Sequence, residues 1–301
     1  MDNKRMGRIT MSRSMEFIVD EKYDGKMLKV YLRGRLKMSA RSVNTLKNCP
    51  GGFLLNGEHI RTVDPVRTGD VLCVTFPEEK NEIPCSDCSD LNIVYEDDDI
   101  LVINKPAGLA VHPTHNHQGD TLANKIAAYY EGKNIVFRAI GRLDKCTSGL
   151  MVIALNRHAA SVLSDRIEKE YMAIAGGVFT GSGTVDKNIY RPDPMKTLRA
   201  VSEDNSLGEH AVTHWQAVAD DGSRTLLKIR LETGRTHQIR VHFAYLGAPL
   251  AGDEMYGSVD RSIPRAALHC ARVELTHPVT WNKMEFEDPL PDDMAEIVAT
   301  F

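Results

Sequence analysis

The sequence lacks the features of membrane-spanning and exported proteins. Its 301 residues contain no apolar run of about eighteen residues, the length that a transmembrane helix needs. The first residues are basic, but no apolar segment follows them, so the start is not predicted to be a secretory signal. We therefore expect a cytoplasmic protein with no membrane partner.

Cysteine is also scarce, with six scattered residues in the whole chain. This usage is typical of a reducing compartment with free thiols. Cys85 and Cys88 could form half of a zinc site, but a structural zinc usually takes four ligands and no second pair follows. His112, His115 and His117 lie close together in a polar segment, which alone is weak support for a metal. The sequence thus favours no metal site.

The charge is unevenly distributed along the chain. The net charge is −4, yet residues 1–80 contain 15 Lys and Arg against 10 Asp and Glu, a balance of +5. Between residues 22 and 47 a cluster of cations accompanies one acid, Asp24. Such a cluster either contacts nucleic-acid phosphates or is a solvated basic face, and composition alone leaves both possibilities open.

Turn residues and changes of composition divide the chain into four parts. Residues 1–15 are predicted to be a flexible tail, and residues 16–80 a small α/β module with helical apolar spacing from Leu28 to Leu46. Residues 81–90 are polar and read as a linker. Residues 91–301 form the large domain.

The large domain is predicted to be α+β, because short apolar strands dominate it and two helices lie among them. One helix is expected to follow an N-cap at Asp120. The other is expected from about His237 to Leu246, ending at Gly247. The predicted strands are residues 93–95, 100–103, 150–155, 171–178 and 226–231.

Three segments of this domain carry reactive side chains: GRLDKCTSGL (141–150), KEYMA (169–173) and TGRTHQIRVH (233–242). Asp144 stands in a loop before a buried strand, where reactive groups are often placed, but Asp-x-x-Thr is also a local turn pattern. Tyr171 could equally pack a sheet. The arginines of the third segment suit carboxylate or phosphate, or could simply face solvent.

Together these segments resemble the RluA-type pseudouridine synthases, whose motifs occur here in the same order. NKPAGL (104–109) and VHP (111–113) resemble the start of that family's domain, and LHC (268–270) with HP (277–278) resembles its end. The likeness covers residues 91–280; Gly141 departs from the histidine of many members. Residues 16–80 are similar, more loosely, to the alpha-L RNA-binding motif shared with a small-subunit ribosomal protein.

The resemblance implies a pseudouridine synthase fold, with a mixed, mostly antiparallel sheet, and isomerisation of uridine without cofactor or metal. Asp144 would act at the ribose as nucleophile or base, and Arg240 would pair with it. Tyr171 would stack on the uracil and take the proton from carbon 5. Arg142 would fill the RNA stack vacated by the flipped base, and Leu268 is a candidate for the apolar wall.

The resemblance also raises RNA contact above a solvated face for the basic module. The residues concerned are Lys29, Arg33, Arg35, Lys37 and Arg41. The leading substrate is a uridine of large-subunit ribosomal RNA, with transfer RNA as the alternative. A catalytically silent RNA-binding protein and a nucleoside hydrolase are the competing functions. We expect a monomer, because residues 285–296 are acidic and offer no apolar interface.

Overall fold

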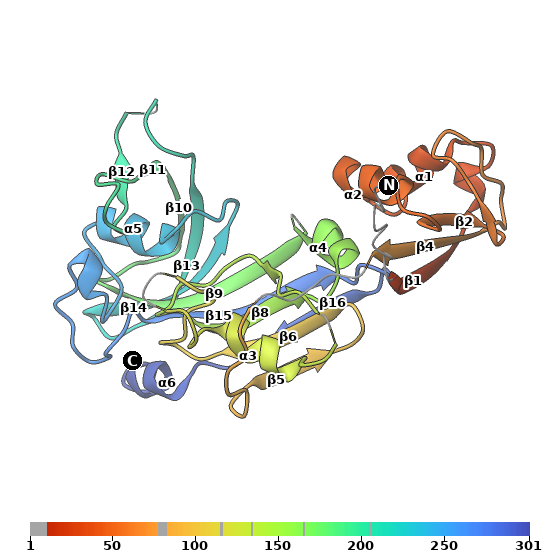
Figure 1. Cartoon of the computed structure of the whole chain (residues 1–301). Coiled ribbons are helices and arrows are strands. Elements are labelled where there is room, and N and C mark those ends of the chain that lie inside the picture. The colour runs from red at the N-terminus through yellow and green to blue at the C-terminus, as the bar shows by residue number, and fades with distance from the viewer. Residues whose placement is uncertain (1–10, 78–82, 115–116, 134, 165, 205) are drawn as a thin grey trace.

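The computed structural model describes residues 11–77, 83–114, 117–133, 135–164, 166–204 and 206–301. In Figure 1 the N-terminal residues form a small lobe beside a larger domain built on a long sheet. None of the helices in these ranges is long and apolar enough to cross a membrane.

The small lobe packs helices on a four-stranded sheet of order β1-β4-β2-β3. The strands are β1 (Met11–Ile18), β2 (Phe53–Leu55), β3 (Glu58–His59) and β4 (Val71–Pro77). The helices are η1 (Glu21–Tyr23), α1 (Leu28–Gly34) and α2 (Ala40–Lys47).

One expectation for this lobe, the extent of the N-terminal tail, is corrected. The strand β1 begins at Met11, so the last residues of the predicted 1–15 tail pair with β4. The apolar spacing from Leu28 to Leu46 belongs to two helices, because Lys37 takes a positive φ of 55° between them. The side chain of Ser39 then caps the second helix by accepting a hydrogen bond from the Ser42 amide.

The large domain is an α+β fold around a mixed sheet, as predicted. The strand order of this sheet is β10-β13-β14-β9-β15-β8-β6-β5. β7 pairs with β8, β16 pairs with β15, and β11 pairs with β12 apart from this sheet. All of the pairings between these strands are antiparallel except that of β8 with β15. The strands are β5 (Asn92–Glu96), β6 (Ile100–Lys105), β7 (Ala139–Ile140), β8 (Ser148–Ala154), β9 (Ile167–Gly176), β10 (Ser182–Asp186), β11 (Asn188–Tyr190), β12 (Ala200–Ser202), β13 (Val212–Asp220), β14 (Arg224–Leu231), β15 (Leu268–Thr276) and β16 (Lys283–Glu287).

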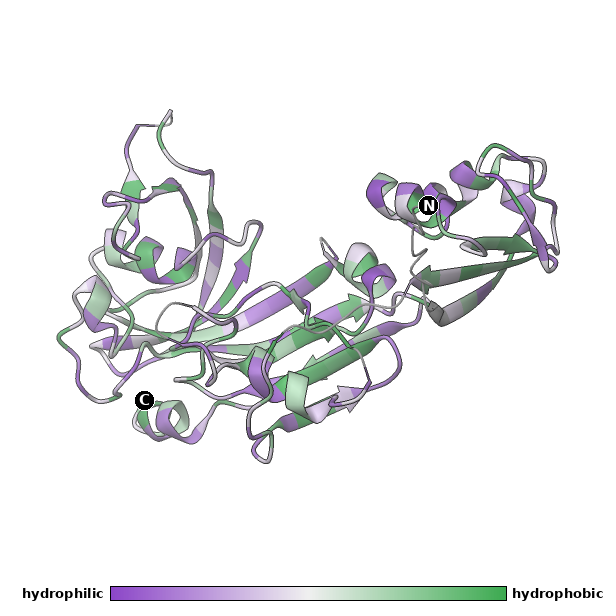
Figure 2. Cartoon of the chain, viewed as in Figure 1, coloured by the Kyte–Doolittle hydropathy of each residue, from purple (hydrophilic) through white to green (hydrophobic). Residues whose placement is uncertain are grey.

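The helices of the large domain flank this sheet. They are α3 (Leu122–Tyr129), α4 (Arg157–Leu163), α5 (Gln238–Tyr245), η2 (Glu254–Tyr256) and α6 (Asp292–Val298). The N-cap of α3 is Thr121, not the expected Asp120, because the Thr121 hydroxyl and the Asn124 side chain form a capping box. The hydrophobic core lies at the centre of the sheet, where β8 is buried along its whole length. Figure 2 shows the strands at this centre as mainly hydrophobic.

The two lobes contact each other at one end of the sheet. The His158 ring of α4 lies 5.9 Å from the Phe17 ring and 6.3 Å from the Phe76 ring. The Arg35 guanidinium lies 4.9 Å from the centre of the Trp281 ring, in the turn between β15 and β16. The predicted linker at 81–90 is described from Ile83 onward, where the Pro84 carbonyl accepts a hydrogen bond from Asn124 of α3.

Candidate active site

The loop that carries Asp144 connects β7 to β8 and is held rigidly at its end. Gly149, at the start of β8, has a φ of 108°, and a Cβ there would meet the Cys270 carbonyl oxygen at 2.3 Å. Only glycine therefore allows β8 to lie this close to β15. The resulting parallel pairing of Gly149 with Cys270 fixes where the loop enters the sheet.

The back of the same loop rests on Lys105, whose side chain is fully buried at the end of β6. Its Nζ donates hydrogen bonds to the carbonyls of Pro106 and Leu109 at 2.8 and 3.0 Å, and to that of Lys145 at 3.4 Å. Burial lowers the pKa of Lys105 to about 8. The NKPAGL segment thus supports the loop that carries Asp144 rather than lining the pocket.

Asp144 and Arg240 meet as predicted, but they are one end of a longer chain of charges. The Arg240 Nη1 atom lies 3.5 Å from Asp144 Oδ2. On its other side Arg240 makes two hydrogen bonds of 2.7 Å to the carboxylate of Asp253. Burial opposes the arginine's charge, but the hydrogen bond with Asp253 and the negative charges nearby raise the pKa of Arg240 overall.

A histidine also faces the aspartate. His237 Nε2 lies 3.9 Å from Asp144 Oδ2, and His237 Nδ1 lies 2.8 Å from the Tyr256 hydroxyl. His237 immediately precedes α5 and has a left-handed φ of 58°. Burial lowers the pKa of His237, and the charge of Asp144 only partly opposes that shift. The sequence-based site did not include His237, Tyr256 or Asp253.

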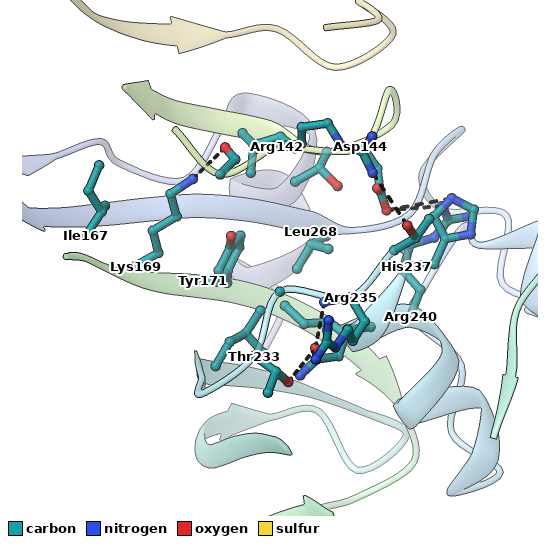
Figure 3. Close-up of a pocket in the computed structure, with 18 of the residues that line it drawn as sticks. Arg142, Asp144, Ile167, Lys169, Tyr171, Thr233, Arg235, His237, Arg240 and Leu268 are labelled. Carbon is teal, nitrogen blue, oxygen red and sulfur yellow. Dashed lines mark hydrogen bonds and ion pairs between the residues drawn. The ribbon is translucent and has the colours of Figure 1, made fainter. Parts of the chain in front are cut away.

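Asp144, His237 and Arg240 line a cavity of about 410 Å³, within the size range of small-molecule sites. Figure 3 shows the cavity with Tyr171 and Leu268 between Lys169 and the Asp144–Arg240 pair. Tyr171 comes from β9, and burial raises the pKa of its hydroxyl well above the usual value. Leu268 begins β15 and supplies an apolar wall, as the sequence suggested.

The beginning of the loop shows how Gly141 is accommodated. Gly141 has a φ of 70°, and a Cβ there would approach Lys169 Nζ to 2.9 Å. Lys169 donates hydrogen bonds to the carbonyls of Ile140 and Gly141 at 3.3 and 2.9 Å. The next residue, Arg142, is exposed, and its Nη2 is 3.5 Å from the Thr236 hydroxyl. Its guanidinium therefore stands at the rim of the cavity.

Comparisons with known proteins agree with this geometry. Residues 99–245 match the family model described as RNA pseudouridylate synthase. The chain is 38% identical to the uncharacterized RNA pseudouridine synthase YjbO of Bacillus subtilis, over 88% of this chain and 96% of that protein. The chain belongs to the RNA pseudouridine synthase family. It is therefore an isomerase whose substrate is RNA.

Further matches support this assignment. The synthase is 40% identical to the ribosomal large subunit pseudouridine synthase D of Vibrio cholerae, with 82% of each chain covered. Its fold is similar to that of the human RNA pseudouridylate synthase domain containing 1, with a TM-score of 0.55 and 26% identity. That match covers 68% of this chain and 85% of the human one.

The predicted RNA-binding residues of the small lobe fall into two groups. Lys29, Arg33, Lys37 and Arg41 are exposed, because the opposite faces of α1 and α2 are packed in the lobe's core. Arg35 differs: its guanidinium makes a 3.2 Å ion pair with Asp20 and stacks on Trp281. Its guanidinium is therefore held by contacts within the synthase, and an RNA contact by Arg35 stays a prediction.

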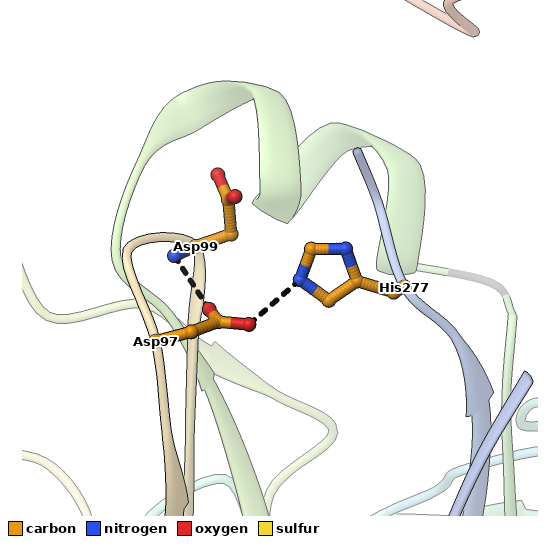
Figure 4. A group of neighbouring side chains, drawn as sticks. All are labelled: Asp97, Asp99 and His277. Atoms are coloured by element: carbon orange, nitrogen blue, oxygen red, sulfur yellow. Dashed lines mark hydrogen bonds and ion pairs between the residues drawn. The ribbon is translucent and has the colours of Figure 1, made fainter. Parts of the chain in front are cut away.

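Among the described residues, one group has the composition of a metal site: Asp97, Asp99 and His277 (Figure 4). His277 Nδ1 accepts hydrogen bonds from the amides of Val279 and Thr280, so Nε2 carries the hydrogen that it shares with Asp97 at 2.9 Å. A protonated nitrogen does not bind metal, and this group instead braces the turn between β15 and β16.

His112 and His117, the two described histidines of this segment, have other partners. His112 packs edge-on against Phe137, with ring centres 5.1 Å apart. His117 Nδ1 lies 2.7 Å from Asp120, and its Nε2 lies 3.1 Å from Lys145 Nζ. His115 lies outside the described residues.

Proposed function

We propose that the synthase converts a uridine of large-subunit ribosomal RNA to pseudouridine with Asp144 as the reacting carboxylate. One observation carries the proposal: Asp144 lines a cavity together with the fixed guanidinium of Arg240 and the buried Tyr171. A carboxylate is ionised at neutral pH and can attack a carbon or accept a proton. The relatives named for the large ribosomal subunit support this choice of RNA.

The reaction is an isomerisation, so its atoms balance without a further reactant. The bond between uracil N1 and ribose C1′ breaks while Asp144 acts at the ribose. The uracil then rotates in the cavity, C5 bonds to C1′, the C5 proton leaves, and N1 gains a proton. The walls formed by Leu268 and Tyr171 hold the free base during this rotation.

Arg240, Tyr171 and Arg142 have separate tasks in this proposal. Arg240 orients Asp144 and favours its charged form. Tyr171 stacks on the uracil. Because its pKa is raised, its hydroxyl is neutral at rest, so it can take the C5 proton only while it gives up its own hydroxyl proton, for which N1 is the acceptor. Arg142, exposed at the rim, enters the stack that the flipped base leaves.

The small lobe is proposed as a second RNA contact, through Lys29, Arg33, Lys37 and Arg41. Their side chains are exposed, as phosphate contacts require. We also propose that the synthase works as a cytoplasmic monomer. The acidic C-terminal segment supports this, because its apolar Met294 and Ile297 are already buried within the chain.

Tritium release from RNA labelled at C5 of uridine tests the role of Asp144. Asp144→Asn keeps the size of the side chain but removes its charge, so we expect release to fall on the order of 10³-fold or more. Glu296→Gln, an exposed carboxylate-to-amide change in α6, should release tritium at the wild-type rate. Release by Asp144→Asn at the control rate would refute the proposed mechanism.

The choice of RNA is tested separately with the wild-type synthase. Transcripts of large-subunit ribosomal RNA and of transfer RNA are compared at equal concentration. Release from the ribosomal transcript alone supports the proposed substrate. Release from transfer RNA alone refutes that substrate but leaves the role of Asp144 intact.

A further inference from the structure

Two hydrogen-bond donors approach the same oxygen of the Asp144 carboxylate. Arg240 Nη1 and His237 Nε2 both approach Oδ2, at 3.5 and 3.9 Å, and neither of these contacts involves Oδ1 (Figure 3). Arg240 is a permanent cation, whereas His237 is titratable. The side chain of His237 is only 11% exposed, so it is a fixed part of the cavity wall.

The hydrogen bonds of Tyr256 determine which nitrogen of His237 carries the hydrogen. The Tyr256 hydroxyl accepts a hydrogen bond from the Arg199 amide at 3.1 Å. Burial raises the pKa of Tyr256, so the hydroxyl keeps its hydrogen. That hydrogen is directed to His237 Nδ1, 2.8 Å away. An accepting Nδ1 leaves the imidazole hydrogen on Nε2, the nitrogen that faces Asp144.

Burial lowers the pKa of His237, which favours the neutral form of the ring. The charged groups that act on it are Asp144 and Asp253 of one sign and Arg240 and Arg199 of the other. A neutral N–H donor can hold a carboxylate oxygen without cancelling its charge. The same contact from an imidazolium would make Asp144 a weaker nucleophile or base.

The backbone of His237 limits which substitutions the position accepts. A φ of 58° is uncommon for residues other than glycine, and asparagine, aspartate and histidine adopt it more readily than other residue types. A variant at this position must therefore be judged both by its side chain and by its fit to the left-handed backbone.

We propose that His237 is a positioning residue for Asp144: its Nε2–H, directed by Tyr256, holds Oδ2 and leaves Oδ1 free to act on the ribose. This inference rests on the proposed role of Asp144. The present 3.9 Å separation is longer than a hydrogen bond, so a shift of less than about 1 Å completes the contact when RNA enters.

Two substitutions at the same position separate this role from a backbone role. His237→Gln places an amide N–H near the position of Nε2 but fits the left-handed backbone poorly. His237→Asn fits that backbone but is too short to reach Asp144. We expect kcat to stay within about threefold of wild type in His237→Gln and to fall about tenfold to a hundredfold in His237→Asn, with KM changed less than about twofold in both. The opposite order, or full activity in both, would overturn the inference.

Tyr256→Phe tests the assignment of the hydrogen without relying on activity. The ¹⁵N shifts of the His237 side chain distinguish a ring protonated at Nε2 from one protonated at Nδ1. We expect the Nε2–H form in the wild-type synthase and a mixture in Tyr256→Phe; an Nδ1–H ring in the wild type would overturn the inference. Asp144→Asn is assayed alongside: if it remained active, the proposed function would fail while the ¹⁵N result still stood.

Discussion

Arg240 is shared unequally by two carboxylates. Asp253 is 1% exposed and takes two short hydrogen bonds, whereas Asp144 is 25% exposed and makes one longer contact. Asp253 therefore fixes where the guanidinium lies, and Asp144 receives a positive neighbour without being fully engaged by it. A reacting carboxylate needs this freedom, since it must move toward the ribose.

We predict that Asp253→Asn lowers both stability and turnover. The substitution leaves a buried arginine without its closest counter-charge, which typically costs about 3–5 kcal/mol. The loosened guanidinium should also lower kcat by about tenfold or more. Urea unfolding and tritium release measure the two effects.

Asp221→Asn is the matched control for Asp253→Asn. It disrupts a similar arginine pair, Arg224–Asp221, in the turn between β13 and β14 and away from the cavity. We expect reduced stability but an unchanged kcat. Equal kcat values for the two variants would show that Asp253 has no special role in positioning Arg240.

At the scale of single residues, the sequence predicts which side chains lie in the site better than it predicts which other side chains contact them. Asp144, Tyr171 and Arg240 were predicted because each stands in a recognisable motif, and the structure places them around one cavity. Asp253 and Tyr256 lie in a short segment whose importance appears only when the fold brings it against α5. Periodicity and motif spacing carry no information on such contacts.

At the scale of elements, the strands at the sheet centre were predictable because they are short apolar runs bounded by turns. The helices were less predictable than these strands. α4 and α6 are each seven residues long, too short for a clear apolar period. The break between α1 and α2 depends on the positive φ of Lys37. Lysine is not a residue type that indicates such a backbone conformation in a sequence.

Two histidines make the stability of these elements dependent on pH. Burial lowers the pKa of His242, in α5, to about 4, and that of His269, in β15, to about 4. Between pH 4 and 6.5 the unfolded chain therefore binds more protons than the folded one, so stability rises with pH across this window and levels off above it.

We predict that the free energy of unfolding drops by a few kcal/mol, about 1.4 per pKa unit for each group, as pH falls from 7 to 4.5. Urea unfolding at a series of pH values measures the drop. His242→Gln should make the slope shallower, because one of the two groups is then removed. A slope unaffected by this variant would mean that other groups dominate the acid response.

At the scale of the molecule, the family and the α+β fold followed from the sequence, but the contact between the lobes did not. Arg35 was predicted to bind RNA with its neighbours, yet it stacks on Trp281 from the far end of the chain. This contact could not be inferred from local composition, because all of the clustered cations look alike in sequence.

We predict that Lys29→Ala/Arg33→Ala weakens RNA binding without changing the chemical step. If each cation neutralises one phosphate, the slope of log K against log salt should decrease by about 1.4 to 1.8. Binding titrations at several salt concentrations measure the slope, and single-turnover tritium release measures the step. Lys133→Ala/Lys283→Ala, which removes the same charge from the large domain, should leave the slope near wild type; an equal decrease would contradict a specific role for the small lobe.

The strand β15 joins the two regions that this proposal assigns to RNA. It begins with Leu268 in the cavity wall and, after nine residues, leads into the turn that carries Trp281 beside the small lobe. At about 3.3 Å per residue, its length is roughly 30 Å. The strand thus fixes the distance between these two regions. If both contact RNA as proposed, we expect a uridine to be selected by its distance from a second RNA feature bound at the small lobe, and therefore by the shape of the folded RNA more than by the bases around the target.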